Sequence, residues 1–190
     1  MIQALIFLLD TFARLYLLIL LLRFWLPFMR ANFRNPVAQG VLKYTSPLVV
    51  PVRRYVPSVG RLDTATVLVA FVIQFVTSLL ILMLGYGPGA LGILASTTGI
   101  LSMVAAAFIN LAILSVIMFI VAIVIRVILN LVGRYFGPLS DLLADMTEPL
   151  LQPIRKLVPP LGVIDLSAYI AIVLLIALNM VLTDLLPAIP

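Results

Sequence analysis

The sequence predicts an all-α membrane protein with four transmembrane helices, which form two tandem parallel helix-loop-helix repeats with Pro-rich amphipathic cytoplasmic loops. Three observations predict this fold. The 190-residue chain is 64% hydrophobic and 10% charged, whereas a soluble domain is roughly 45–50% apolar. Four apolar stretches are close to or above the roughly 20 helical residues that cross a hydrocarbon core. A segment rich in proline and arginine also occurs twice.

The first expected span covers residues 4–28 and contains charged side chains. Asp10 and Arg14 are four residues apart, in the order that favours an ion pair on one helix face. Two interpretations stay open. If the membrane begins near Thr11, both charges lie at the interface; if it begins earlier, they form a buried polar switch or an element of an ion pathway. Because no Lys or Arg precedes this stretch, we expect no cleaved signal peptide.

The second and third spans are expected within the uncharged stretch Thr64–Ile125, which is long enough for two helices. Several glycines and a proline interrupt this stretch between positions 85 and 92, and such residues mark turns. We therefore expect spans over residues 64–84 and 100–128. The fourth span is expected over residues 166–186, which are uncharged almost to the end.

Further polar side chains are predicted in these spans. Asn110 lies on a stripe of small residues, which favours close packing against another helix. The alternative is that such polar side chains line a narrow hydrophilic route: Asn110, Gln74, Thr77, Ser78 and Asn179. Arg23 and Arg126 lie near the ends of the first and third spans, where we expect their long side chains to extend to the lipid headgroups.

The two long loops between the spans contain nine of the twelve basic residues. By the positive-inside rule, both loops face the cytoplasm. Both chain termini and the glycine-rich connector over residues 85–99 then lie on the periplasmic side of the cell inner (plasma) membrane. The nine basic residues are Arg30, Arg34, Lys43, Arg53, Arg54, Arg61, Arg134, Arg155 and Lys156.

An internal repeat divides the chain into two units. Residues 45–63 recur as residues 147–165, with nine of nineteen positions identical. We therefore expect one repeat over residues 1–88 and a second over residues 89–190, as is typical of repeated architectures. Each unit contains two spans, so both units enter the membrane in the same direction and the repeats are parallel.

The repeated loop is predicted to contain a short helix at the membrane interface. Thr45 or Ser46 is expected to cap its start, followed by Pro47, and Thr147-Glu148-Pro149 has the same pattern in the second copy. A further proline, Pro51, removes an amide from the first turn, so we expect a bent or broken helix. Its apolar side would lie against the lipid.

Each loop also offers an ion pair that would close it onto the next span. Arg53 and Asp63 are ten residues apart, as are Arg155 and Asp165. The alternative is that each aspartate only caps the following helix, which contributes roughly 0.3–1 kcal/mol. The residues expected to bind lipid or a partner are Pro47, Pro51, Arg53, Arg54, Pro57, Gly60 and Asp63 in the first loop, and Pro149, Pro153, Arg155, Lys156, Pro159, Gly162 and Asp165 in the second.

The pattern Pro-x-x-x-Pro-x-Arg-[Arg/Lys]-x-x-Pro-x-x-Gly-x-x-Asp resembles the YggT family, called YlmG in chloroplasts and cyanobacteria. The resemblance covers both copies, although Lys156 replaces the second arginine and Gly137 stands where the first copy has Asn35. It implies a multi-pass plasma-membrane protein without known enzymatic activity. Members of this family have been linked to osmotic and ion homeostasis, to division and nucleoid organisation, and to cytochrome assembly in chloroplasts.

The chain contains no cysteine and no histidine, which excludes thiol nucleophiles, disulfides, and thiolate or imidazole metal sites. We therefore expect no catalytic residue, no cofactor and no metal. The first hypothesis is a non-enzymatic organiser or assembly factor whose loops bind anionic lipid and another membrane protein or a second copy of the chain. The alternative is an ion channel or ion-flux modulator. Four acidic residues in the second loop argue against nucleic acid as a partner.

Overall fold

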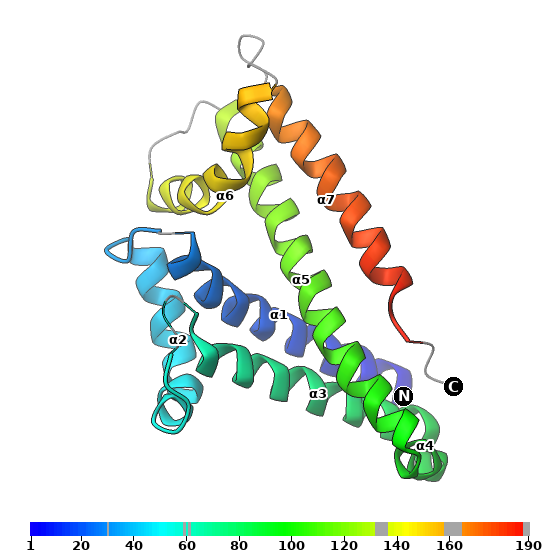
Figure 1. The fold of residues 1–190 in the computed structure, drawn as a ribbon. Helices are drawn as coiled ribbons and strands as arrows, with labels where there is room; N and C mark the ends of the chain where they lie inside the picture. Colours follow the sequence, from blue (N-terminus) through cyan, green and yellow to red (C-terminus); the bar gives the residue numbers. More distant parts are fainter. Residues whose placement is uncertain (30, 59, 61, 132–136, 158–164, 188–190) are drawn as a thin grey trace.

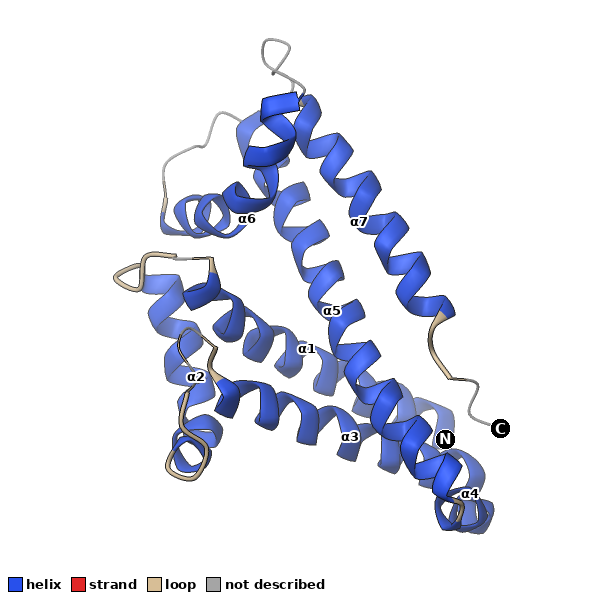
Figure 2. Cartoon of the chain, viewed as in Figure 1, coloured by secondary structure: helices blue, strands red, loops and turns tan. Residues whose placement is uncertain are grey.

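The computed structural model describes residues 1–29, 31–58, 60, 62–131, 137–157 and 165–187. These residues fold into seven α-helices and one short 3₁₀ helix (Figures 1 and 2). The elements are α1 (Ile2–Phe28), α2 (Pro36–Arg53), α3 (Thr64–Tyr86), the 3₁₀ helix η1 (Gly87–Gly89), α4 (Ala90–Ala95), α5 (Thr97–Leu131), α6 (Pro138–Leu157) and α7 (Leu166–Asp184). Four of them, α1, α3, α5 and α7, are long and apolar enough to cross a membrane, which confirms the predicted fold class.

The four long helices form two hairpins that contact each other. In the first hairpin α1 packs on α3, and in the second α5 packs on α7. Helix α5 also contacts α3 and α1, so it joins the two hairpins. Helices α2 and α6 contact each other at one end of the spans, and the start of α1 and the end of α7 lie at the other end with α4 (Figure 1). The two repeated loops therefore lie on the same side of the protein.

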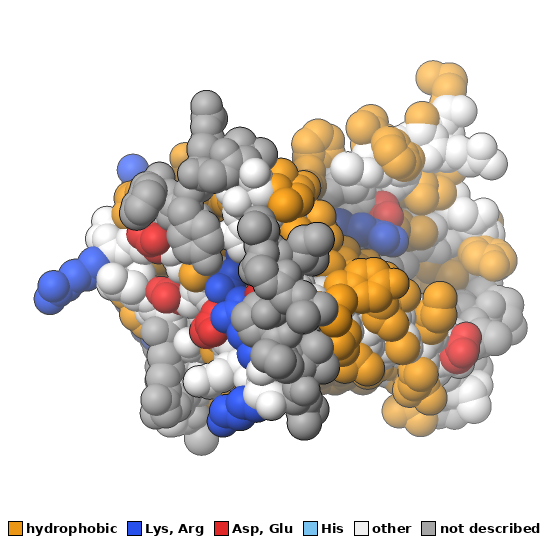
Figure 3. All heavy atoms as spheres, turned by 90° about the horizontal axis from the view of Figure 1, so that it is seen from above, with side chains coloured by type: hydrophobic (Ala, Val, Ile, Leu, Met, Phe, Trp, Pro, Cys, Tyr) orange, Lys and Arg blue, Asp and Glu red, His pale blue; other side chains and the backbone are white. Residues whose placement is uncertain are grey.

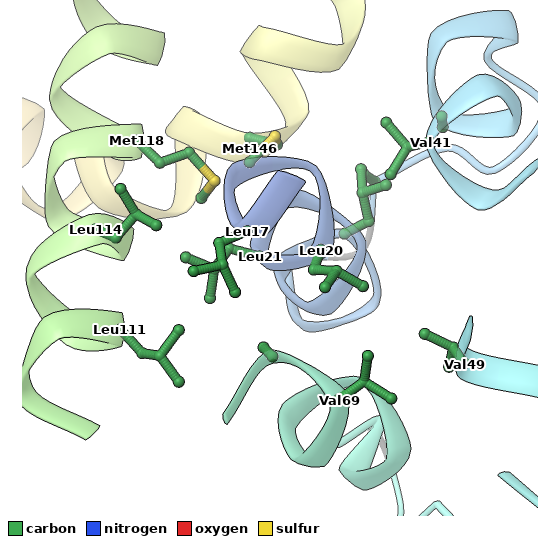
Figure 4. Packing of buried hydrophobic residues seen from close by; sticks show 14 of the residues in the cluster. Leu17, Leu20, Leu21, Val41, Val49, Val69, Leu111, Leu114, Met118 and Met146 are labelled. Atoms are coloured by element: carbon green, nitrogen blue, oxygen red, sulfur yellow. The ribbon is translucent and has the colours of Figure 1, made fainter. Parts of the chain in front are cut away.

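The apolar core lies where α1, α2, α3, α5 and α6 meet. Leu17 and Leu20 of α1 are fully buried at its centre, and Val49, Leu114 and Met146 reach it from α2, α5 and α6 (Figure 4). Trp25 of the same cluster packs edge to face against Phe119 of α5, with ring centroids 5.0 Å apart. Large apolar side chains elsewhere on the spans are exposed, as expected for a lipid-facing surface.

The long helices extend beyond several of the predicted bounds. Helix α5 has 35 residues, about 52 Å at 1.5 Å per residue, and is therefore longer than the hydrocarbon core. The connector expected over residues 85–99 is itself mostly helical, with η1 and α4 in it. At Gly87 the backbone has a positive φ of 55°, which glycine adopts without a steric penalty and which ends α3.

The predicted start of the loop helix is wrong. Helix α2 begins at Pro36, where Asn35 caps it by accepting a hydrogen bond from the Val37 amide at 2.9 Å. Thr45 and Ser46 therefore lie inside the helix. In the same way α6 begins at Pro138, well before Thr147. We expected Pro47 and Pro149 near the helix starts, whereas Pro36 and Pro138, eleven residues earlier, satisfy the same preference for proline at the first helical position.

Both loop helices continue through two internal prolines. Pro47 and Pro51 lie inside α2, and Pro149 and Pro153 lie inside α6. Each proline removes one amide donor and bends the helix, and both helices change direction along their length in Figure 1. The helix persists because one face of it is buried: in α2 this face consists of Ala38, Val41, Thr45 and Val49.

Candidate functional site

A buried arginine of α1 lies beneath the first loop helix. The side chain of Arg23 is only 4% exposed. Its guanidinium donates hydrogen bonds to the hydroxyl of Thr45 at 2.9 Å and to that of Ser46 at 3.3 Å, both on α2. The predicted extension of Arg23 to the lipid headgroups is therefore wrong. Helix α2 folds across the end of α1 and encloses the side chain before it reaches the surface.

Asp63 joins three elements at this point. It caps the start of α3 by accepting a hydrogen bond from the Thr66 amide at 3.4 Å. Its carboxylate lies 3.6 Å from Nε of Arg23 and forms an ion pair with Arg53 at the end of α2. Both interpretations of Asp63 drawn from the sequence, the helix cap and the loop-closing ion pair, are therefore realised together.

The second repeat builds a corresponding cluster. Arg126 of α5, 9% exposed, donates hydrogen bonds to the hydroxyl of Thr147 and to the carboxylate of Glu148, both at 2.7 Å. Arg155 donates to Glu148 at 2.8 Å and from its Nε to Asp165 at 3.2 Å. Asp165 caps α7 through the Ser167 amide at 3.1 Å. The predicted extension of Arg126 to the headgroups is wrong for the same reason as that of Arg23, because α6 covers it.

The two clusters differ in the carboxylate that connects their arginines. In the first cluster Asp63 contacts both Arg23 and Arg53. In the second cluster Glu148 contacts both arginines, Arg126 and Arg155. In the alignment of the two repeats, Glu148 corresponds to Ser46. The first cluster thus combines two positive charges with one negative charge, whereas the second has two of each, counting Asp165. The first cluster retains a net positive charge.

Both helix-capping aspartates are held in the ionised state. Burial by itself raises the pKa of Asp63, but the hydrogen bonds from Thr66 and the charge of Arg53 outweigh it, so the pKa lies below its usual value. Burial likewise raises the pKa of Asp165, but the hydrogen bonds from Ser167 and Arg155 have the larger effect. The pKa of Asp165 is therefore also below its usual value. The pKa of Arg155 is raised by Asp165 and Glu148 despite its burial.

The two repeats are joined by hydrogen bonds between the starts of their loop helices. The amide of Asn32 donates to the carboxylate of Asp145 on α6 at 3.0 Å, and the side-chain amide of Asn35 donates to the carbonyl of Pro138. A cavity of about 400 Å³ lies beside these contacts, with Arg34 and Asp141 in its lining. Figure 3 shows that most of the visible charged side chains gather near one end of the molecule, while hydrophobic side chains cover much of the rest.

A second polar feature lies within the spans. Nε of Arg14 donates a hydrogen bond to Asp10 at 2.9 Å, which confirms the predicted pairing on α1. Both side chains line a cavity of about 410 Å³ between α1, α3 and α5. Gln74 and Ser78 of α3, with Asn110 of α5, supply further polar lining. Asn110 thus faces a cavity, and among the described residues it has no hydrogen-bond partner across a helix interface.

Comparison with known proteins identifies the family to which this architecture belongs. The family model described as CCB3/YggT matches residues 2–84 and 97–186, which include both hairpins and both loop helices. The chain belongs to the CCB3/YggT family. It is 33% identical to YggT of Escherichia coli K12 over 191 residues, covering 98% of this chain and 93% of that protein. It is 40% identical to protein PA0392 of Pseudomonas aeruginosa, covering 97% and 91%. No solved structure is significantly similar.

The paired arginines of this YggT-family chain have two different environments. Arg53 and Arg155 form the internal ion pairs described above. Arg54 and Lys156, the next residues along the chain, have exposed side chains and make no ion pair with any described residue. The arginine at the first position of each pair is therefore engaged in internal ion pairs, although Arg53 is still 47% exposed, and the cation at the second position is exposed without an ion pair to a described residue.

The remaining predicted residues of the first loop, Pro57 and Gly60, lie in the turn after α2. The carbonyl of Pro57 accepts a hydrogen bond from the Thr64 hydroxyl at 2.7 Å. Gly60 has a positive φ of 60°, which permits the turn before Asp63. Pro159 and Gly162, their counterparts in the second repeat, lie outside the described residues.

Three contributors to this YggT-family site were not found from the sequence. Thr45 and Thr147 were interpreted as helix caps, although they are the acceptors for the buried arginines. Glu148 was counted only as part of an acidic loop, although it pairs with two arginines. The sequence did contain a signal for the two threonines as partners of the arginines. They occupy matching positions of the repeat, and each lies 21 or 22 residues after an arginine of the preceding span.

Proposed function

We propose that the protein is a non-enzymatic organiser or assembly factor of the inner membrane, and that α2 and α6 bind anionic lipid and a protein partner. The observation that carries this proposal is the division of the cationic residues. Arg53 and Arg155 are engaged in internal ion pairs, which leaves Arg54 and Lys156 exposed at the same end of the molecule. These two side chains are free to contact a surface outside the protein.

The lipid part of the proposal rests on charge and on apolar exposure. Lys43 adds a further exposed cation on α2; Tyr44 and Leu48 of the same helix are exposed, as is Tyr55 just after its end. A helix with basic and apolar exposed side chains binds at a membrane surface. Each basic residue near an anionic leaflet contributes about 1 kcal/mol. By the positive-inside rule this end faces the cytoplasm, and the termini face the periplasm.

The partner part of the proposal rests on the contact between α2 and α6. Exposed Arg34 and exposed Asp141 line the same cavity, so this seam presents both signs of charge within a short distance. Neighbouring patches of opposite charge favour a complementary protein surface, because they fix its orientation. The partner is another membrane protein or a second copy of this chain.

The experiment extracts the protein from native membranes with its surrounding lipid after gentle cross-linking. The test variant combines Arg54→Gln with Lys156→Gln, and the control combines Arg54→Lys with Lys156→Arg. We expect the wild type and the control to retain anionic lipid and a cross-linked partner, and the Gln variant to lose anionic lipid by about fivefold per charge. A lone monomer without enriched anionic lipid contradicts the proposal.

Ion flux is the second candidate function, and the cavity beside Asp10 and Arg14 favours it. On the side of that cavity toward α2, however, α1 contributes Leu17, Leu20 and Leu21 to the apolar core. These residues would oppose a hydrated path along α1. Purified protein in liposomes tests this function directly: potassium, sodium or proton flux no greater than that of empty vesicles excludes it.

A further inference from the structure

The ion pair of α1 lies inside its helix, closer to the start than to the end. Arg23 of the same helix is enclosed by α2, which covers the other end of the span. Arg14 precedes Arg23 by nine residues, or about 14 Å along a helix. Asp10 and Arg14 lie eight and twelve residues after the start of α1 at Ile2, and α1 is long and apolar enough to cross a membrane. The pair is therefore within the span.

Arg14 has more hydrogen-bond donors than the protein satisfies. A guanidinium carries five N–H donors, and Nε of Arg14 uses one of them on Asp10. The terminal nitrogens have no acceptor among the described residues, and the side chain is 63% exposed. Unpaired donors on a charged group are unfavourable in hydrocarbon. An acceptor from outside the described chain is therefore expected at this place.

The space beside Arg14 has the size and chemistry of a ligand site. Its volume of about 410 Å³ falls in the range of small-molecule pockets. Gln74 and Asn110 line it with side-chain amides that both donate and accept hydrogen bonds. The side chain of Asn110 has no hydrogen-bond partner among the described residues. Tyr86, at the end of α3 away from α2, also lines the cavity.

We propose that this cavity binds a zwitterion of the phosphoethanolamine class. Its phosphate accepts from the terminal nitrogens of Arg14, and its ammonium donates to Asp10 and to the amide oxygen of Asn110. The pair of Asp10 and Arg14 is neutral overall, so a ligand with a net charge would leave that charge uncompensated in the membrane. A zwitterion keeps the site neutral while it satisfies both side chains. The proposal does not depend on the organiser function.

This chemistry has two sources, a phosphatidylethanolamine headgroup and a free solute, and the experiment separates them. Native mass spectrometry of the purified protein measures binding of dilauroyl-phosphatidylethanolamine, with dilauroyl-phosphatidylglycerol as the anionic comparison. A second arm measures binding of soluble glycerophosphoethanolamine, with glycerophosphoglycerol as its anionic comparison. In the arm that matches the source, we expect the zwitterionic compound to bind about tenfold more tightly than the anionic one.

The variants Asp10→Asn and Arg14→Gln are expected to lose this preference, because each removes one of the two charges. Asn110→Leu keeps the ion pair and fills the cavity, so it should lower zwitterion binding even if a charge variant does not fold. Arg54→Gln lies outside the cavity, at the proposed anionic-lipid surface, so it should lower binding of phosphatidylglycerol and leave zwitterion binding as in the wild type. Equal binding of both lipids with no binding of the soluble compound overturns the proposal, as does unchanged preference in the three cavity variants.

Discussion

Two buried guanidinium groups, those of Arg23 and Arg126, determine the chemistry at the end of the spans. Removing a charged group from water is unfavourable unless hydrogen bonds and an opposite charge compensate it. In each repeat a threonine hydroxyl supplies one acceptor, at 2.9 Å from Arg23 and 2.7 Å from Arg126. A carboxylate supplies the opposite charge. The threonine thus connects the span to the loop helix that covers it.

Replacing Thr45 with valine tests this connection at the level of a single atom. Thr45→Val keeps the shape but leaves a buried donor of Arg23 without its acceptor, which should lower the free energy of unfolding by about 1–3 kcal/mol. Fluorescence of Trp25, the one tryptophan of the chain, reports unfolding in detergent because its ring packs against Phe119. Thr45→Ser retains the hydroxyl and is the control. Equal unfolding midpoints for the two variants would rule out this role.

At the scale of the element, the loop helices and the spans after them are fixed by their first residues. Asn35 and Pro36 begin α2, and Asp63 begins α3. Because Asp63 also pairs with Arg53 at the end of α2, the start of α3 and the end of α2 are held by one carboxylate. Asp165 connects α6 and α7 in the same way through Arg155.

These capping aspartates predict how stability depends on pH. The pKa values of Asp63 and Asp165 are lowered in the folded protein, so the unfolded chain binds more protons near their ordinary pKa of about 3.9. Their contribution is complete above that value and is lost as the pH falls through the lower folded pKa. We expect the unfolding midpoint to decrease on acidification below about pH 4.

The matching control is the double variant Asp63→Asn with Asp165→Asn, measured by the same Trp25 fluorescence between neutral pH and acid. Its unfolding midpoint should be lower than that of the wild type at neutral pH and should change less on acidification. A wild type whose midpoint is the same at both ends of this range would contradict the prediction.

At the scale of the whole molecule, the two repeats form one unit with a common polar end. Helix α5 packs against the first hairpin, and α2 contacts α6. The hydrogen bonds from Asn32 and Asn35 cross between the repeats at that contact. Both repeated loops are therefore on one side of the membrane, as the parallel arrangement predicts.

The absence of cysteine from the chain makes this topology directly measurable. Single cysteines at Arg54 and Lys156 should react with a membrane-impermeant thiol reagent only after the cells are permeabilised, because we propose from the positive-inside rule that both positions face the cytoplasm. Single cysteines at Pro88 and Leu185 should react in intact cells. Labelling of positions 54 and 156 on opposite sides would contradict the structure, and labelling of both in intact cells would reverse its orientation.

Much of this arrangement could be predicted because its signals are local. The apolar stretches determined four spans, and the spacing of Asp10 and Arg14 predicted a pair that the structure contains. The helix starts at Pro36 and Pro138 were missed, since the prolines inside the helices resemble starting prolines when burial is unknown. The partners of Arg23 and Arg126 were missed because they lie on another helix, 21 or 22 residues away.

The sequence by itself determined what each segment is: which stretches favour hydrocarbon, where the chain repeats and on which loops the positive charge lies. Those properties follow from side-chain hydrophobicity and charge, which do not depend on neighbours in space. Only the tertiary structure decided which arginines are enclosed and which are exposed, and that Asp10, Arg14, Gln74, Ser78 and Asn110 share one cavity. Burial and hydrogen bonding depend on which helices meet, and the composition of any one helix does not specify its neighbours.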